Sequence, residues 1–242
     1  MWNTIFVQPI LNLLVAFYHL LFSNFGLAII GMTLFVRLLL FPLSLPALRM
    51  SKRQQDLKPE LDKLREKYKD DKEKLAQAQM EFMRKHNLNP ALGCLPQIIQ
   101  FVFLIALYQV FRRFLSDGGF AIQELNNLLY FDFLRFPSTA QINTRFLYLD
   151  LTKPDPYYIL PIVSGVLQYG LMKFMRPSKK KDVAEESDND IMSGMQGQMA
   201  FLFPLMTVFI GFKLQSGLVV YWLMGIVVSM LQQLWVSRQS DG

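Results

Sequence analysis

Residues 27–45, LAIIGMTLFVRLLLFPLSL, form a largely apolar stretch with a single charged residue, Arg37, near its middle. A helix of this length is about as long as a bilayer's hydrocarbon core is thick, roughly 30 Å. An arginine at the centre of such a helix costs about 2.5 to 3.5 kcal/mol on insertion scales, so these residues usually face water, a partner or a substrate. No other apolar stretch contains an acid to pair with it. The stretch predicts a membrane span with a functional cation. A structural arginine bonded to backbone carbonyls of a neighbouring helix is the alternative.

Composition also indicates a membrane protein. Of 242 residues, 52% are hydrophobic and 14% aromatic, and a soluble domain of this size would not normally carry several apolar stretches approaching twenty residues. The net charge is +6, and the basic residues lie mostly in two segments between apolar stretches, so topology explains them and we predict no nucleic-acid specificity. Cys94 is the single cysteine, and His19 and His86 are far apart. The sequence therefore predicts no disulfide, metal site, cofactor or catalytic constellation, and the protein is not expected to be an enzyme.

Five apolar stretches reach or approach span length, which predicts an all-α polytopic membrane protein with five transmembrane helices. The chain then divides into an interfacial amphipathic helix at 1–23, spans at 24–48, 92–114, 156–175, 195–212 and 216–237, a cytoplasmic helical hairpin at 49–91, an extracytoplasmic loop at 115–155, a cytoplasmic linker at 176–194 and a cytoplasmic tail at 238–242.

The first apolar segment has a polar face. On a helical wheel, one arc of about 100° collects Thr4, Gln8, Asn12, His19 and Ser23, and the opposite face is apolar. This pattern favours a helix lying in the membrane interface over a sixth span. The segment has no basic beginning and no small-residue cleavage pattern, so it is not an ordinary signal peptide.

Positive charge sets the expected orientation. Residues 49–90 carry twelve Lys and Arg, whereas residues 116–155 carry three. The first segment is therefore expected in the cytoplasm. Five spans then place the N-terminal segment outside and the C-terminus inside. Arg112 and Arg113 go against this trend but do not outweigh the twelve.

The cytoplasmic segment is expected to form two helices. An apolar seam of Leu57, Leu61, Leu64 and Tyr68 predicts the first helix. Asp70 with Glu73 predicts a cap for the second, which should run to about His86. This hairpin is interpreted as a docking or substrate-receiving arm, and the residues expected to dock are Lys58, Lys63, Arg65 and Lys67. A solvated connector is the alternative.

Polar residues recur on one face of four of the spans. The stripes are Gly26, Thr33, Arg37 and Ser44; Gln97, Gln100 and Tyr108; Tyr157, Ser164 and Gln168; and Gly217, Tyr221 and Gln232. One stripe is usually interhelical hydrogen bonding, but four, one with an unpaired arginine, predict a shared hydrated cavity. An ion pore and a groove open sideways to lipid both fit this pattern.

Five separated motifs carry a family resemblance. They are Phe35-Val36-Arg37 with Phe41-Pro42-Leu43; Leu57-Lys58-Pro59-Glu60-Leu61 with Leu64-Arg65-Glu66-Lys67-Tyr68; Asn89-Pro90-Ala91-Leu92-Gly93-Cys94-Leu95-Pro96 with Ile99-Gln100; Asp155-Pro156-Tyr157-Tyr158-Ile159-Leu160-Pro161; and Ser216-Gly217-Leu218-Val219-Val220-Tyr221-Trp222. In this order, they resemble the YidC membrane insertases over nearly the whole chain from about residue 20. One departure is Phe101-Val102 after Gln100, where the family commonly has Met-Pro, so the second span should be straighter there.

The resemblance implies a hydrophilic groove that is open to the cytosol and lipid. It also implies that the protein inserts and folds membrane proteins, alone or beside the Sec translocon. Arg37 is similar to the groove arginine that attracts acidic residues of a translocated tail. Thr33 and Gln100 correspond to groove-lining positions, and Tyr221 and Trp222 to aromatic positions along the path of the substrate's apolar segment.

The expected partners are nascent membrane proteins with short acidic tails, the lipid bilayer, the Sec translocon, the signal recognition particle receptor and the ribosome. A bacterial plasma membrane is the expected location. From other classes, a small anion transporter or channel with Arg37 as its selectivity site and a passive assembly scaffold stay open as alternatives.

Overall fold

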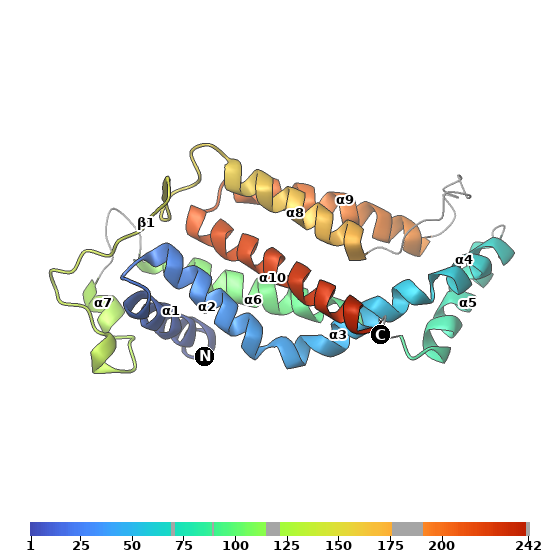
Figure 1. Cartoon of the computed structure of the whole chain (residues 1–242), viewed down its shortest axis with the longest axis horizontal. Coiled ribbons are helices and arrows are strands. Elements are labelled where there is room, and N and C mark those ends of the chain that lie inside the picture. Colours follow the sequence, from blue (N-terminus) through green and yellow to red (C-terminus); the bar gives the residue numbers. More distant parts are fainter. Residues whose placement is uncertain (69–70, 89, 115–121, 176–190, 241–242) are drawn as a thin grey trace.

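The computed structural model describes residues 1–68, 71–88, 90–114, 122–175 and 191–240, and this part of the chain is mostly helical (Figure 1). The helices are η1 (Asn3–Val7), α1 (Gln8–Leu20), α2 (Phe25–Leu39), α3 (Phe41–Asp56), α4 (Lys58–Lys67), α5 (Lys72–Lys85), α6 (Pro90–Phe114), α7 (Ile122–Asn126), η3 (Asp132–Leu134), α8 (Ile159–Met175), α9 (Ile191–Gly211) and α10 (Ser216–Ser240). One small antiparallel pair, β1 (Arg145–Phe146) with β2 (Leu149–Asp150), lies between α7 and α8.

The last helix lies at the centre of the molecule. α10 packs against α2, α3, α6 and α8, while α9 packs against α8 (Figure 1). Two buried clusters hold these helices together. The larger cluster joins α1, α2, α6, the segment around β1 and β2, and the beginning of α10, and the smaller cluster contains Leu171, Trp222 and Ile226. Gly217 permits the close start of α10, because a Cβ atom there would lie 2.5 Å from the ring of Phe111.

The stretch that contains Arg37 is not one straight helix. α2 ends at Leu39 and α3 begins at Phe41, with a 70° bend between them. Pro42 lies in the first turn of α3, and it has no N–H to continue the hydrogen bonding of α2. The helical wheel that placed Ser44 beside Arg37 assumed one straight helix, so the bend removes that basis. α6, by contrast, runs through Phe101 and Val102 without a break.

Length and composition alone make two of the described helices candidates for crossing a membrane, 3–20 and 216–239, or three if bent α2 and α3 form one span. Shorter apolar helices cover Ile98–Arg112, Ile159–Met175 and Phe201–Gly211. These findings support an all-α membrane protein. The count of five spans and the interfacial position of the N-terminal helix stay predictions.

The two helices expected in the cytoplasmic segment are α4 and α5, which pack against each other (Figure 1). The cap of α5 lies one residue later than predicted, because the side chain of Asp71 accepts the hydrogen bond from the N–H of Lys74 at 3.1 Å. Asp70 lies outside the described residues. α5 ends at Lys85, with His86 as its C-terminal cap, close to the predicted end. The segment 49–56 continues α3 rather than starting a separate helix.

Polar side chains of the N-terminal helix form hydrogen bonds with a later segment of the same chain. Asn12 donates to the carbonyl of Leu128 at 2.9 Å and accepts from the N–H of Tyr130 at 2.7 Å. Gln8 also donates to the carbonyl of Leu128, at 3.0 Å, and Nε2 of His19 lies 3.1 Å from the carbonyl oxygen of Leu134. The amphipathic pattern therefore reflects contact with the segment 122–158, called here the outer segment. It does not by itself require a membrane interface.

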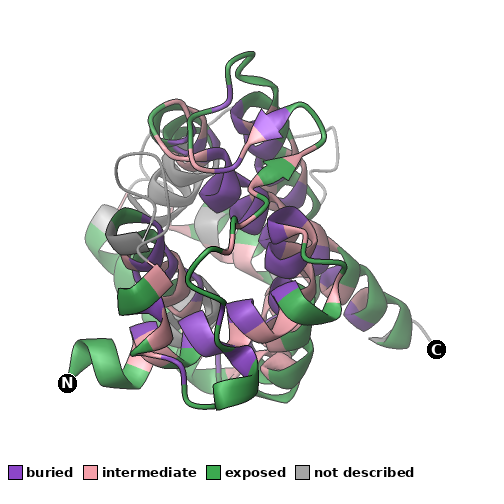
Figure 2. Ribbon diagram, turned by 90° about the vertical axis from the view of Figure 1, so that its left-hand side faces the viewer, coloured by how far each residue is buried: buried purple, intermediate pink, exposed green. Residues whose placement is uncertain are grey.

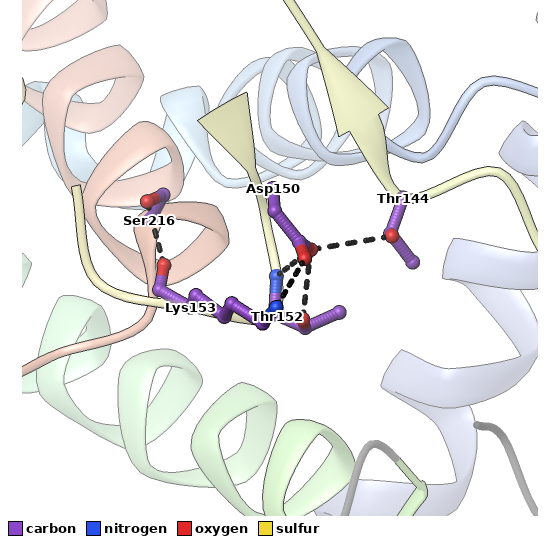
Figure 3. Close-up of polar contacts among 5 residues, drawn as sticks. All are labelled: Thr144, Asp150, Thr152, Lys153 and Ser216. Carbon is purple, nitrogen blue, oxygen red and sulfur yellow. Dashed lines mark hydrogen bonds and ion pairs between the residues drawn. The ribbon is translucent and has the colours of Figure 1, made fainter. Parts of the chain in front are cut away.

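The outer segment is also fastened to the beginning of α10 (Figure 3). The backbone N–H and the hydroxyl of Ser216 both donate to the carbonyl of Lys153 at 2.7 Å. Nearby, Asp150 accepts from the hydroxyls of Thr144 and Thr152 and from the N–H of Thr152. Figure 2 looks onto this end of the molecule and shows exposed loops over buried helix faces.

Candidate functional site

A pocket lies beside the bend between α2 and α3, where α6 and α10 approach it. Its cavity volume is about 30 Å³, and its lining residues are Thr33, Val36, Arg37, Leu40, Ser44, Ile99, Gln100, Phe103 and Tyr221. Four helices supply these residues. The pocket is therefore formed by packing and not by any one sequence segment.

Arg37 is held by neutral side chains. Its Nη1 donates to the hydroxyl oxygen of Ser229 at 3.2 Å, and its Nη2 donates to Oε1 of Gln100. Among the described residues, no carboxylate lies within ion-pair distance of the guanidinium. The alternative of an arginine bonded to backbone carbonyls is thus not what the structure shows. The charge is positioned but not neutralised.

The donors that this pocket leaves available to a ligand belong to Arg37 and Gln100, because the hydroxyls of Thr33 and Ser229 already donate to backbone carbonyls. The hydroxyl of Thr33 donates to the carbonyl of Ile29 at 2.6 Å, and that of Ser229 donates to the carbonyl of Gly225 at 2.8 Å. Oε1 of Gln100 accepts from Arg37, whereas its buried Nε2 has no hydrogen-bond partner in the described part of the chain. A guanidinium carries five N–H donors and no acceptor. The arrangement suits an anionic group that only accepts hydrogen bonds, such as a carboxylate.

Four of the predicted groove residues line this pocket: Thr33, Arg37, Gln100 and Tyr221. Ser44 also lines it despite the bend. The side chain of Gln97 lies outside the described residues.

Three predicted groove residues lie outside the pocket. Ser164 and Gln168 are buried on α8 and do not line the pocket, and α8 packs mainly on α9 and α10. Trp222 packs with Leu171 and Ile226 in the smaller cluster, because successive residues on a helix point about 100° apart and Tyr221 takes the pocket side. Residues from three of the four predicted stripes line the pocket, whereas Tyr157, Ser164 and Gln168 of the remaining stripe do not.

Two pocket contacts were missed from the sequence. Ser229 bonds Arg37, and Gly225 lies against Arg37 and Gln100. Both continue the series begun by Tyr221 at steps of four, so the helical spacing could have indicated them. Small residues rarely attract notice in a span, because they usually serve helix packing.

The predicted docking residues lie on α4. Lys63 and Lys67 are exposed, and Nζ of Lys67 lies 5.2 Å from the ring centre of Tyr68. The side chains of Lys58 and Arg65 lie outside the description. Their docking role stays a prediction.

Comparison with known proteins places the chain in a family. Residues 16–242 match the family model described as 60Kd inner membrane protein. The chain belongs to this family. A relative named membrane protein insertase YidC, from Fusobacterium nucleatum, is 31% identical over 217 residues, which cover 90% of this chain and 88% of the relative. The membrane protein insertase MisCA of Bacillus subtilis is 33% identical over 228 residues, 93% of this chain and 74% of the relative.

Other relatives are longer. The membrane protein insertase YidC of Geobacter sulfurreducens is 31% identical over 237 residues, and the match spans 98% of this chain but 38% of the relative. The resemblance drawn from the five motifs is thus confirmed. The family consists of membrane proteins whose named relatives are insertases rather than enzymes.

Proposed function

We propose that this chain is a membrane protein insertase in which the Arg37 pocket binds the acidic tail of a substrate while the substrate's apolar segment passes into lipid. The observation that carries the proposal is a guanidinium inside a membrane-protein bundle, held by Ser229 and Gln100 and left without a carboxylate among the described residues. The printed names of its relatives support the same activity.

The proposed physical role of the pocket is to lower the free energy of placing a polar tail inside the hydrocarbon region of the membrane. A charge in low dielectric attracts an opposite charge far more strongly than in water. Neutral partners orient the guanidinium without neutralising its positive charge, so it can still attract an anionic tail. For an acidic tail the membrane potential adds about 2.3 kcal/mol per charge per 100 mV. Within the described chain no residue group could hold a metal ion, and the proposal needs only hydrophobic partitioning and the membrane potential.

The apolar part of the substrate is proposed to leave along lipid-facing surfaces. α9 exposes large apolar side chains such as Phe201 and Phe209, and α8 exposes Ile162 and Val166. These surfaces fit a hydrocarbon environment, because large exposed apolar patches mark contact with a membrane or a partner. The substrate's hydrophobic partitioning into lipid then completes the transfer.

The membrane topology that we propose is the one that the family resemblance implies. We propose five spans in a bacterial plasma membrane, with the N-terminus outside, the C-terminus in the cytoplasm and the α4 and α5 arm in the cytosol. On that arm, exposed Lys63 and Lys67 with Lys58 and Arg65 are proposed to receive substrates or to meet the ribosome, the signal recognition particle receptor or the Sec translocon. Gln97, Ser164, Gln168 and Trp222 are proposed to contact a substrate only along a path that extends beyond the pocket.

The test is a protease-protection assay in proteoliposomes that contain only this protein. A short single-span substrate is offered with an acidic tail or with the matched Asp→Asn tail, to wild type, Arg37→Lys and Arg37→Ala. We expect Arg37→Lys to retain most insertion of the acidic tail and Arg37→Ala to lose about tenfold or more, the value of roughly one charge-assisted hydrogen bond. Arg112→Ala is the control, because Arg112 is exposed on the same bundle.

Each outcome separates one class of protein from another. Equal insertion by all three variants would remove the charge from the mechanism while keeping the insertase. Failure of the wild type to insert either tail would favour an assembly scaffold. Saturable anion flux through the same vesicles, without insertion, would favour the anion transporter or channel.

A further inference from the structure

Gly225 is the point where the two donor groups of the pocket meet α10. A Cβ atom built there would lie 2.9 Å from Nη2 of Arg37, 2.9 Å from Nε2 of Gln100 and 3.1 Å from its Oε1. Real Cβ atoms essentially never approach other heavy atoms closer than 3.0 Å. Any larger residue at this position must therefore move Arg37, Gln100 or both.

The same turn of α10 holds the other side of the guanidinium. Nη1 of Arg37 donates to the hydroxyl oxygen of Ser229, and that hydroxyl donates to the carbonyl of Gly225. The guanidinium thus lies across one helical turn, with Nη1 at Ser229 and Nη2 over Gly225. A glycine inside a helix is unfavourable relative to alanine, so its presence here calls for a local reason.

Helix packing does not supply that reason. A Cβ at Gly165 would meet Val208 at 2.3 Å, and one at Gly217 would meet Phe111 at 2.5 Å, so those glycines accommodate neighbouring apolar side chains. At Gly225 the nearest atoms belong to a cation and an amide. The space that this glycine leaves is occupied by the pocket's polar groups.

We propose that Gly225 is a positioning residue that sets where the pocket presents its donors. It lets the guanidinium of Arg37 lie against α10 beside Nε2 of Gln100, which no described residue binds, so that one carboxylate of a passing tail meets both groups. The inference rests on the proposed function and deepens it, since it names the ligand group as a single carboxylate and the geometry that selects it. A Cβ atom at position 225 displaces the guanidinium from Gln100 and separates the two donors.

The experiment compares Gly225→Ala with Gly170→Ala. Gly170 lies in α8, and a Cβ there would have nothing within 4 Å, so this variant controls for adding a methyl group to a helical glycine. Insertion of the acidic-tail substrate and its neutral counterpart is measured in proteoliposomes, together with thermal unfolding in detergent. The atoms displaced at position 225 are the far ends of flexible side chains, so the fold should survive.

For Gly225→Ala we expect the ratio of acidic to neutral insertion to fall about five- to tenfold, corresponding to one weakened charge-assisted hydrogen bond. Neutral insertion should stay at the wild-type value and the unfolding temperature should not fall, whereas Gly170→Ala should leave the ratio unchanged and can raise the unfolding temperature, because alanine favours a helix over glycine. Gly225→Ser, which adds the same Cβ atom, should reproduce the effect. An unchanged ratio, or an equal loss for both tails, would overturn the positioning role.

Failure of the insertase function and failure of the Gly225 role give different results. If wild type shows no insertion, or no dependence on Arg37, the proposed function itself has failed. If wild type favours the acidic tail through Arg37 and Gly225→Ala behaves as wild type, only the role of Gly225 has failed.

Discussion

The outer segment and the Arg37 pocket use polar residues in opposite ways. In the outer segment the buried carboxylate of Asp155 accepts three hydrogen bonds, from the hydroxyl of Tyr148 at 3.1 Å and from the N–H groups of Tyr157 at 3.0 Å and Leu160 at 2.7 Å. In the pocket, the described residues give the guanidinium of Arg37 only neutral partners and give Nε2 of Gln100 none. Saturated polar groups fix a structure, whereas unsaturated ones are available to a ligand.

The contrast has an energetic side. Hydrogen bonds to charged groups contribute about 1.5 to 3 kcal/mol each, while a buried polar group without a partner costs about 1 to 3 kcal/mol. The outer segment should therefore stabilise the fold, and the pocket should contribute little or oppose it. The same saturation acts on Asp150, where burial would raise the pKa but hydrogen bonds from Thr152 and the nearby charge of Lys153 lower it.

The largest loss of stability is expected for Asp155→Ala. The substitution leaves the N–H groups of Tyr157 and Leu160 without their acceptor at the beginning of α8, and we expect the free energy of unfolding to fall by about 3 kcal/mol or more. Unfolding in mixed detergent micelles measures it. Asp132→Ala is the control, because Asp132 forms an exposed ion pair with Arg135 at 2.9 Å and should cost less than about 1 kcal/mol. Equal losses would show that the hydrogen bonds around Asp155 stabilise the fold no more than an exposed ion pair does.

A smaller loss is expected for Asn12→Ala. Asn12 is buried and joins α1 to Leu128 and Tyr130, so its removal should cost about 1 to 3 kcal/mol. Hydrogen exchange at the N–H of Tyr130 should also become faster, because that group loses its acceptor. Thr4→Ala on the same face is the control, since Thr4 is exposed. Unchanged exchange at Tyr130 would mean that the outer segment is held in place without Asn12.

Asn12 also shows which features of the fold could be predicted from the sequence and which could not. Periodicity predicted which face of the N-terminal helix is polar, but not what lies against that face, because the partners are backbone groups more than a hundred residues away. The sequence likewise predicted Arg37, Thr33, Gln100 and Tyr221 for one site, because the three spans that contain these residues each have a polar stripe. It did not predict the bend at Leu40 or the exclusion of Ser164, Gln168 and Trp222, because helix order and rotation around α10 are set by packing. Gly225 and Ser229 are small, and only the position of the guanidinium reveals their role.

The smallest change in stability is expected for Arg37→Met, and this result would complete the comparison. Methionine fills similar space and removes a partly buried charge that no described carboxylate offsets, while Ser229 keeps its bond to the carbonyl of Gly225. Replacing a buried charge by an apolar group of similar volume is often neutral or stabilising. We therefore expect the free energy of unfolding to stay within about 1 kcal/mol of wild type or to rise, while insertion of acidic tails falls as in Arg37→Ala. A loss above about 3 kcal/mol would show instead that Arg37 holds the helices together through Gln100 and Ser229, and would turn the pocket into a second structural network like that around Asp155.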